Sequence, residues 1–272
     1  MFNTVKKIIK YPRLTQDYPN KSGNAWFLGQ TGIERSKCNF CGECALRCPS
    51  EAIVLDQAAG HIGINYDRCI FCVLCEEVCP TGAVTTTNKF ELAQKDKALL
   101  RNESFNGDRA INPTLTIIDK KLPDMSCEEM SKELEAKIKK SFGRSLKIRE
   151  VDSGSCNGCD YEVNALNNPI NDIERLGISF VASPRHADML LVTGTGARNM
   201  QLALHKTYEA TPDPKLVVAV GACACSGGIF RESYATNNGI DSIVPVDVYI
   251  PGCPPRPQAI IYGILKALDR VK

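Results

Sequence analysis

The chain contains the run Cys38-x-x-Cys41-x-x-Cys44-x-x-x-Cys48-Pro49, and the same pattern recurs as Cys69-x-x-Cys72-x-x-Cys75-x-x-x-Cys79-Pro80. Each run is followed by a stretch that passes from a turn into a short β-strand, over 50–54 and over 81–85. The repeat therefore predicts a small duplicated unit over residues 31–88.

The spacing of these cysteines indicates iron–sulfur chemistry. Three thiolates at three-residue spacing can bind three corners of a four-iron cube, and the cysteine before proline then binds the other cluster, as in bacterial two-cluster ferredoxins. Zinc sites usually separate their C-x-x-C pairs by a longer loop, and cysteines this close together cannot all form unstrained disulfides. We expect cluster 1 to be bound by Cys38, Cys41, Cys44 and Cys79, and cluster 2 by Cys69, Cys72, Cys75 and Cys48.

The composition is that of a globular protein with an ordinary core. The 272 residues are 43% hydrophobic, and 33 Lys and Arg face 31 Asp and Glu, for a net charge of +2. This balance disfavours nucleic-acid binding, which usually needs a basic excess, and it disfavours disorder. The 14 cysteines lie in tight groups, which indicates metal binding in a reducing compartment. No secretory signal or apolar run long enough to span a bilayer is present, so we expect a cytoplasmic chain without a transmembrane span.

Two segments flank the duplicated unit. Residues 1–30 form an N-terminal arm whose start has the pattern of an amphipathic helix, which would lie on a membrane surface or membrane subunit or pack as a solvated helix on its own domain. Residues 89–144 are expected to be a connector with a helix over 127–142. Cys127 stands alone there and is best explained as a small buried side chain. The helical pattern of the arm comprises Phe2, Val5, Ile8 and Ile9, with Lys6, Lys7 and Lys10 between them.

Strands alternate with helices from residue 145 to residue 272, which predicts an α/β, flavodoxin-like domain with a mostly parallel sheet. The expected strands are 146–151, 178–181, 189–193, 216–220 and 246–250, and the expected helices are 161–166, 198–208 and 258–268. The fold class is thus an α+β ferredoxin-like two-cluster domain followed by this α/β domain.

The remaining cysteines follow three of these strands, at the edge where such sheets carry their functional loops. Four of the five would bind cluster 3, with a zinc site or free thiols as alternatives. The pattern alone does not choose between Cys223 and Cys225. Glycines in the same loops would let the backbone approach a cluster and donate N–H groups to its sulfurs. The cysteines are Cys156, Cys159, Cys223, Cys225 and Cys253, and the glycines are Gly158, Gly221, Gly227 and Gly252.

Several phrases in this half resemble the small-subunit family shared by [NiFe] hydrogenases and the 20 kDa subunit of respiratory complex I. They are Ile148–Asp160, Ser183–Asp188, Arg198–Met200 and Val246–Pro255. Residues 1–90 resemble the two-cluster ferredoxin-type subunit of the same assemblies. The chain is therefore similar to two usually separate subunits joined together.

Two details place the resemblance nearest to energy-converting (group 4) hydrogenases and formate hydrogenlyases. Cys156 and Cys159 are separated by two residues, whereas the complex I subunit has two adjacent cysteines there. The family phrase Gly-x-Cys-Ala-x-x-Gly-Gly implies Cys223 as the third ligand and leaves Cys225 as an extra thiol. The phrase Thr193–Ala197 departs from the family's usual sequence, which affects local packing and no ligand.

The resemblance implies an oxidoreductase subunit that carries electrons through three [4Fe–4S] clusters between a donor such as ferredoxin and the Ni–Fe site of a separate large subunit. Its partners would be that subunit, membrane-embedded antiporter-like subunits and a donor such as ferredoxin, at the inner face of the cell membrane. The alternatives are a complex I-like quinone oxidoreductase subunit and a free-standing electron carrier.

Other polar residues carry weaker expectations. The resemblance suggests Glu162 as a proton relay, which requires a pKa raised by burial, although a carboxylate at a helix N-terminus explains it nearly as well. Arg185 and His186 would face a partner, tune a cluster or, more simply, make structural hydrogen bonds. We expect no role for His61 or His205.

Overall fold

The computed structural model describes residues 27–101 and 144–268, together with a few isolated positions near the N-terminus (6, 7, 10, 14–16 and 18) and positions 132 and 136. The apolar positions of the N-terminal helical pattern, Phe2, Val5, Ile8 and Ile9, lie outside the described residues. So do Cys127 and nearly all of the helix expected over 127–142. No helix among the described residues has the length and apolar character needed to cross a membrane.

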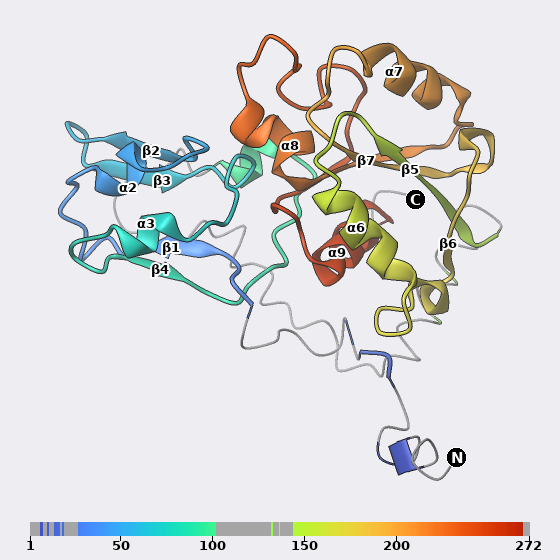
Figure 1. Ribbon diagram of the computed structural model, residues 1–272, viewed down its shortest axis with the longest axis horizontal. Helices are drawn as coiled ribbons and strands as arrows, with labels where there is room; N and C mark the ends of the chain where they lie inside the picture. Colours follow the sequence, from blue (N-terminus) through green and yellow to red (C-terminus); the bar gives the residue numbers. More distant parts are fainter. Residues whose placement is uncertain are drawn as a thin grey trace.

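The cysteine repeat folds into a separate lobe (Figure 1). Strand β1 (Thr31–Ile33) pairs antiparallel with β4 (Val84–Thr86), and β2 (Ile53–Asp56) pairs antiparallel with β3 (His61–Ile64). Each cysteine run enters a four-residue helix, α2 (Glu43–Leu46) or α3 (Leu74–Glu77). Sheets of two strands and helices of one turn have little stability of their own, so this lobe depends on what its cysteines bind and on its neighbour.

The second half is built on a five-stranded, all-parallel sheet in the order β6-β5-β7-β8-β9. In chain order this is 2-1-3-4-5, the order of flavodoxin-like doubly wound sheets. The parallel α/β domain predicted after the cysteine repeat is thus confirmed. The strands are β5 (Leu146–Asp152), β6 (Ile178–Phe180), β7 (Met189–Thr193), β8 (Leu216–Val220) and β9 (Val248–Ile250).

The helices differ from the sequence prediction mainly at their ends. The first begins at Gly158 rather than residue 161, because the cysteine loop itself turns into the helix. The glycine-rich stretch after β8, expected as a loop, forms a short helix. The helices are α6 (Gly158–Asn164), α7 (Gln201–Ala210), α8 (Gly221–Ser226) and α9 (Pro257–Leu268), with the 3-10 turns η1 (Lys97–Leu100), η3 (Ala165–Asn167), η4 (Ile173–Leu176), η5 (Pro184–His186) and η6 (Gly228–Phe230).

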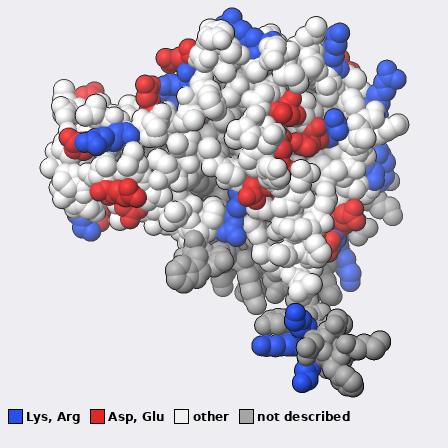
Figure 2. All heavy atoms as spheres, viewed as in Figure 1, with Lys and Arg blue, Asp and Glu red and all other residues white. Residues whose placement is uncertain are grey.

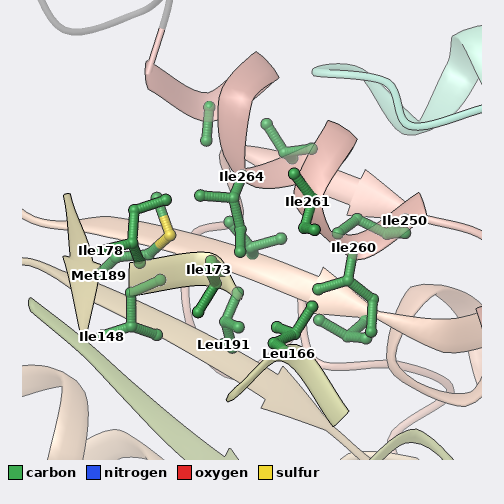
Figure 3. Close-up of a cluster of buried hydrophobic side chains, with 14 of the residues drawn as sticks. Ile148, Leu166, Ile173, Ile178, Met189, Leu191, Ile250, Ile260, Ile261 and Ile264 are labelled. Atoms are coloured by element: carbon green, nitrogen blue, oxygen red, sulfur yellow. The ribbon is translucent and has the colours of Figure 1, made fainter. Parts of the chain in front are cut away.

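Both faces of the parallel sheet are buried, because side chains alternate along each strand. On one face, Met189 and Leu191 pack with α9 and with the segments after α6 (Figure 3). On the other face, Leu190 and Val192 pack with Leu204 of α7 and with a cluster that extends into the cysteine lobe. The near-continuous apolar strands seen in the sequence therefore reflect burial on two sides.

Residues 89–101, predicted as part of the connector, form a strap that joins the lobe to the α/β domain. Gln94 and Tyr249 exchange two backbone hydrogen bonds of 3.0 and 2.8 Å, which pairs the strap with the edge strand β9. The Lys97 ammonium lies 2.9 Å from Asp241. A buried hydrogen bond of 2.7 Å from the Ser226 hydroxyl to the Asp67 carbonyl adds a direct contact between lobe and domain.

Part of the N-terminal arm also contacts the α/β domain. The Gln16 amide donates to the Ile170 carbonyl at 2.8 Å, and the Arg175 guanidinium donates to the Tyr18 carbonyl at 2.8 Å. The Tyr18 ring is buried in the core of the domain, 5.7 Å from Phe90. Residues on both sides of the cysteine lobe in the sequence therefore hold it to the domain.

Charge is distributed as the balanced composition predicts. Acidic and basic side chains of the described residues are both spread over the face drawn in Figure 2.

Candidate metal centres

The two cysteine runs adopt the same backbone despite different sequences between the cysteines. Phe40 and Phe71 both have positive φ, of 56° and 55°. The residue before each short helix also has a left-handed backbone conformation: φ is 84° at Gly42 and 65° at Val73. A β-branched residue is rare in this region, so the shared loop shape is imposed by the position of the cysteines rather than by local preference.

Thiols from the two runs meet across the repeat. The thiols whose charge acts on Cys44 are those of Cys38, Cys79 and Cys41. Those that act on Cys69 are Cys75, Cys48 and Cys72. One cavity in the lobe is lined by all four cysteines of the second group. The structure thus brings together two groups of four thiols. Each group takes three cysteines from one run and one from the other, as the spacing predicts.

Backbone amides donate to sulfur at equivalent positions of the two runs. The Ala52 amide lies 3.3 Å from Cys48 Sγ, and the Ala83 amide lies 3.2 Å from Cys79 Sγ. Burial tends to raise the pKa of Cys79, but hydrogen bonds from the Thr81 hydroxyl and from backbone amides outweigh it and lower the pKa. Such bonds stabilise negative charge on sulfur and are one means by which proteins set cluster potentials.

Other thiols in the lobe are held in apolar surroundings. Burial, followed by the charge of neighbouring thiols, raises the pKa of Cys69 to about 12 and that of Cys75 to about 11. The thiolate is the form that binds metal. These side chains therefore suit a multiply charged metal group, which supplies the positive charge that their surroundings lack.

A third group of thiols gathers at the carboxyl-terminal edge of the parallel sheet. Cys156 and Cys159 follow β5, Cys223 lies in α8 after β8, and Cys253 follows β9. Burial, and then the thiols of Cys223, Cys253 and Cys156, raise the pKa of Cys159. The pKa of Cys223 rises to about 11 through burial and the thiols of Cys253 and Cys156. The thiols of these four cysteines therefore lie close enough for the charge of one to act on another.

Cys225 points away from this group. It is fully buried, and its thiol donates to the Ile250 carbonyl at 3.6 Å. Two residues along an α-helix correspond to a rotation of about 200°, so Cys223 and Cys225 lie on opposite sides of α8. The choice that the sequence pattern leaves open is thus decided by helix geometry in favour of Cys223 as the neighbour of the other three.

Gly221 is the glycine that the thiol group requires most clearly. Its φ is +90°, and a Cβ at this position would lie 2.5 Å from Cys159 Sγ. Gly158 makes an ordinary contact, with its Cβ position 3.5 Å from Cys156 Sγ. Gly227 and Gly252 instead pack closely against the backbone of Asn238 and Pro255. Gly228, which the sequence analysis missed, lies beside Cys223, with 3.3 Å between its Cβ position and Sγ.

Carboxyl groups lie beside the third thiol group. Burial raises the pKa of Glu162, while the Arg256 charge opposes this. Burial and a hydrogen bond with Asp160 raise the pKa of Glu150 to about 7. Asp160 also accepts hydrogen bonds from Ser155 at 2.6 Å and from Thr193 at 2.7 Å. The Glu150–Asp160 pair has no signal in the sequence, because its members are ten positions apart on a strand and a helix.

The remaining candidates lie away from the thiols. Arg185 and His186 are exposed in η5, which precedes β7 and so lies at the opposite end of the sheet. His205 is exposed and lies 3.6 Å from Glu209. His61 lies in β3 of the cysteine lobe.

The three thiol groups have the donors that four-iron clusters use. A four-iron cube binds each thiolate at a separate corner, so its ligands surround the group without converging on one point. Donor type, grouping and the close approach at Gly221 all suit such a cluster.

Comparison with known proteins matches both halves of the chain. Residues 156–267 match the family model of the NADH ubiquinone oxidoreductase 20 kDa subunit, and residues 37–83 match the 4Fe-4S dicluster domain. A probable membrane-bound hydrogenase subunit of Pyrococcus furiosus is 51% identical over 136 residues, which cover 50% of this chain and 81% of that protein. Formate hydrogenlyase subunit 7 of Escherichia coli is 47% identical over 144 residues, 53% of this chain and 56% of that protein. An NADH-quinone oxidoreductase subunit of Geobacter metallireducens is 50% identical over 113 residues, 42% of this chain and 66% of that protein.

Proposed function

The chain belongs to the family of the 20 kDa subunit of NADH ubiquinone oxidoreductase and is an electron-transfer subunit of an oxidoreductase complex; on this premise we propose that it carries electrons through three [4Fe–4S] clusters in a membrane-associated, energy-converting [NiFe] hydrogenase. The observation that carries the proposal is the gathering of twelve thiols into three groups of four, two in the cysteine lobe and one at the sheet edge.

We assign the ligands group by group. Cluster 1 takes Cys38, Cys41, Cys44 and Cys79, cluster 2 takes Cys69, Cys72, Cys75 and Cys48, and cluster 3 takes Cys156, Cys159, Cys223 and Cys253. A bound [4Fe–4S] cluster takes up and releases single electrons. The chain itself supplies spacing, burial and hydrogen bonds to sulfur.

The position of the second thiol group supports a role in relaying electrons. The thiol of Cys72 acts electrostatically on Cys253, and Ile70 and Phe71 line the same cavity as Cys253. The loop of the second group therefore adjoins the loop of the third. The strap over residues 89–101 and the Ser226–Asp67 hydrogen bond fix the position of one loop relative to the other.

The hydrogenase assignment rests on the third group. Cys156 and Cys159 are separated by two residues, and two relatives that match 136 and 144 residues of the chain are named as a probable membrane-bound hydrogenase subunit and as formate hydrogenlyase subunit 7. We propose a separate large subunit with the Ni–Fe site, membrane-embedded antiporter-like subunits and a donor such as ferredoxin as partners. The complex would lie on the cytoplasmic face of the membrane.

A second candidate is a quinone-reducing complex without hydrogenase chemistry. It is favoured by the 50% identity to the NADH-quinone oxidoreductase subunit of Geobacter metallireducens. In that case the same chain would hold its clusters beside a large subunit that lacks nickel.

Purification of the assembly tests the proposal. The chain would be affinity-tagged in its native host, and the complex purified anaerobically and assayed for nickel and for hydrogen evolution with reduced ferredoxin. We expect a nickel-containing large subunit and hydrogen evolution. Quinone reduction by a nickel-free complex would establish the second candidate instead.

A further inference from the structure

The Arg256 guanidinium occupies an unusual position beside the third thiol group. It follows Cys253 by three residues and lies against two aromatic rings, 4.5 Å from the centroid of Phe27 and 4.8 Å from that of Phe90. The rings belong to the segments that enter and leave the cysteine lobe. Guanidinium groups bind favourably to aromatic faces, so the two rings fix the position of this charge.

Glu162 is the carboxylate whose charge acts on Arg256, and it does so without a direct ion pair. The Arg256 Nε donates to the neutral amide oxygen of Gln258 at 2.7 Å, and Nη1 is buried without a hydrogen-bond partner among the described residues. No ion pair of 4.0 Å or less joins Arg256 to a carboxylate in that part of the chain, and Glu162 acts on it only from a greater distance. Burial lowers the pKa of Arg256, but a guanidinium stays charged in proteins.

Arg256 is partly buried, and a positive charge withdrawn from water gains from negative charge placed near it. Arg256 and Cys253 line one cavity, together with Ile70 and Phe71 from the second thiol loop. Four thiolates around a [4Fe–4S] core carry net negative charge, which increases on reduction. A cluster bound at the third thiol group would therefore place negative charge beside the cavity that Arg256 lines.

We propose that the positive charge of Arg256, held in place by the two rings, raises the reduction potential of cluster 3. It does so because it stabilises the reduced state of the cluster, which is the more negative one. This inference rests on the proposed function, since it requires a cluster at the third thiol group. Ile70 and Phe71 from the loop of the second group line the same cavity as Arg256, so the charge would favour electron uptake at the junction between the two halves of the chain.

The sign of the effect separates this role from simple packing. Removal of the positive charge lowers the potential, because the reduced state loses a favourable interaction. Loss of packing would instead admit water, which solvates the more highly charged reduced state better and raises the potential. A purely structural residue would therefore move the potential in the opposite direction, or not at all.

The test is an anaerobic redox titration of cluster 3, followed by electron paramagnetic resonance in the purified complex. Arg256→Gln and Arg256→Met remove the charge, Arg256→Lys keeps it, and Arg144→Gln is the control. Arg144 pairs with Asp188 at the opposite end of the sheet. We expect the two neutral variants to make reduction about tenfold less favourable, about 59 mV for one electron, with Lys close to wild type and the control unchanged.

An unchanged or raised potential in both neutral variants, with the cluster 3 signal intact, would overturn the inference. Absence of a third cluster signal from the wild-type complex is a different result, because it would contradict the proposed function itself.

Discussion

Replacement of Gly221 by alanine should remove cluster 3 and leave the other two. A Cβ at this position would lie 2.5 Å from Cys159 Sγ, where ordinary contacts begin at 3.4 Å, so the sulfur would have to retreat by about 1 Å. Functional sites tolerate about 0.5 Å of displacement. The φ of +90° adds about 1–2 kcal/mol of backbone strain for a residue with a side chain.

The assay combines iron analysis with electron paramagnetic resonance of the reduced, anaerobically prepared chain. We expect the iron content of Gly221→Ala to fall from about twelve to about eight atoms per chain, with loss of one of three signals. The signals of clusters 1 and 2 should be unchanged, because their thiols lie in the other lobe.

Gly82→Ala is the matched control. Gly82 has a φ of +62°, but a Cβ there would meet nothing within 4 Å. This variant should lose about 1–2 kcal/mol of stability through strain alone and keep all its iron. If Gly221→Ala retained all three signals, or if Gly82→Ala lost iron to the same extent, the steric reasoning would be refuted.

Three further predictions concern the thiols, the lobe and its attachment. Cys223→Ser should lose about four irons, whereas Cys225→Ala should keep them because its thiol is buried on the other side of α8; equal iron loss in both variants would contradict the assignment. Removal of iron by a chelator under oxidising conditions should unfold residues 31–88 and leave the α/β domain folded, since the α/β domain keeps a large core of its own and the lobe has only two-stranded sheets among its described residues; uniform protection of both halves in hydrogen exchange would count against this. A double-mutant cycle of Lys97→Met and Asp241→Asn should give a coupling free energy of about 0.5–1 kcal/mol in urea unfolding, because the pair is part-buried. A coupling of zero would show that this ion pair does not help to hold the strap on the α/β domain.

The fold was predictable where the signal is local. The buried strands at 189–193 and 216–220 lie where their continuous apolar runs indicate, because both faces of a parallel sheet are covered. The helix that starts at Gly158 was displaced in the prediction, since its first turn is formed by the cysteine loop. The helix over Gly221–Ser226 was missed because glycine and serine have low helix propensity, and the sheet edge and thiol group stabilise it instead.

The sequence predicts which cysteines belong to the candidate site, but it does not predict the backbone and side-chain groups that surround them. Regular spacing predicts the two groups in the lobe, and the ends of strands predict the third. Strand ends alone leave Cys223 and Cys225 open; the family phrase implies Cys223, and the orientation of α8 places Cys225 away from the other thiols. The contact of Gly228 with Cys223 and the Glu150–Asp160 pair depend on how the chain folds back within each loop, and the ring contacts of Arg256 join segments distant in sequence.

The most direct test is a count of iron and acid-labile sulfide in the intact chain, prepared without oxygen and then fully reduced for spin quantification. Three four-iron centres require about twelve irons, about twelve sulfides and three paramagnetic signals. About eight irons with only two signals would contradict a cluster at the sheet edge, and zinc in place of iron would contradict the electron-transfer role altogether.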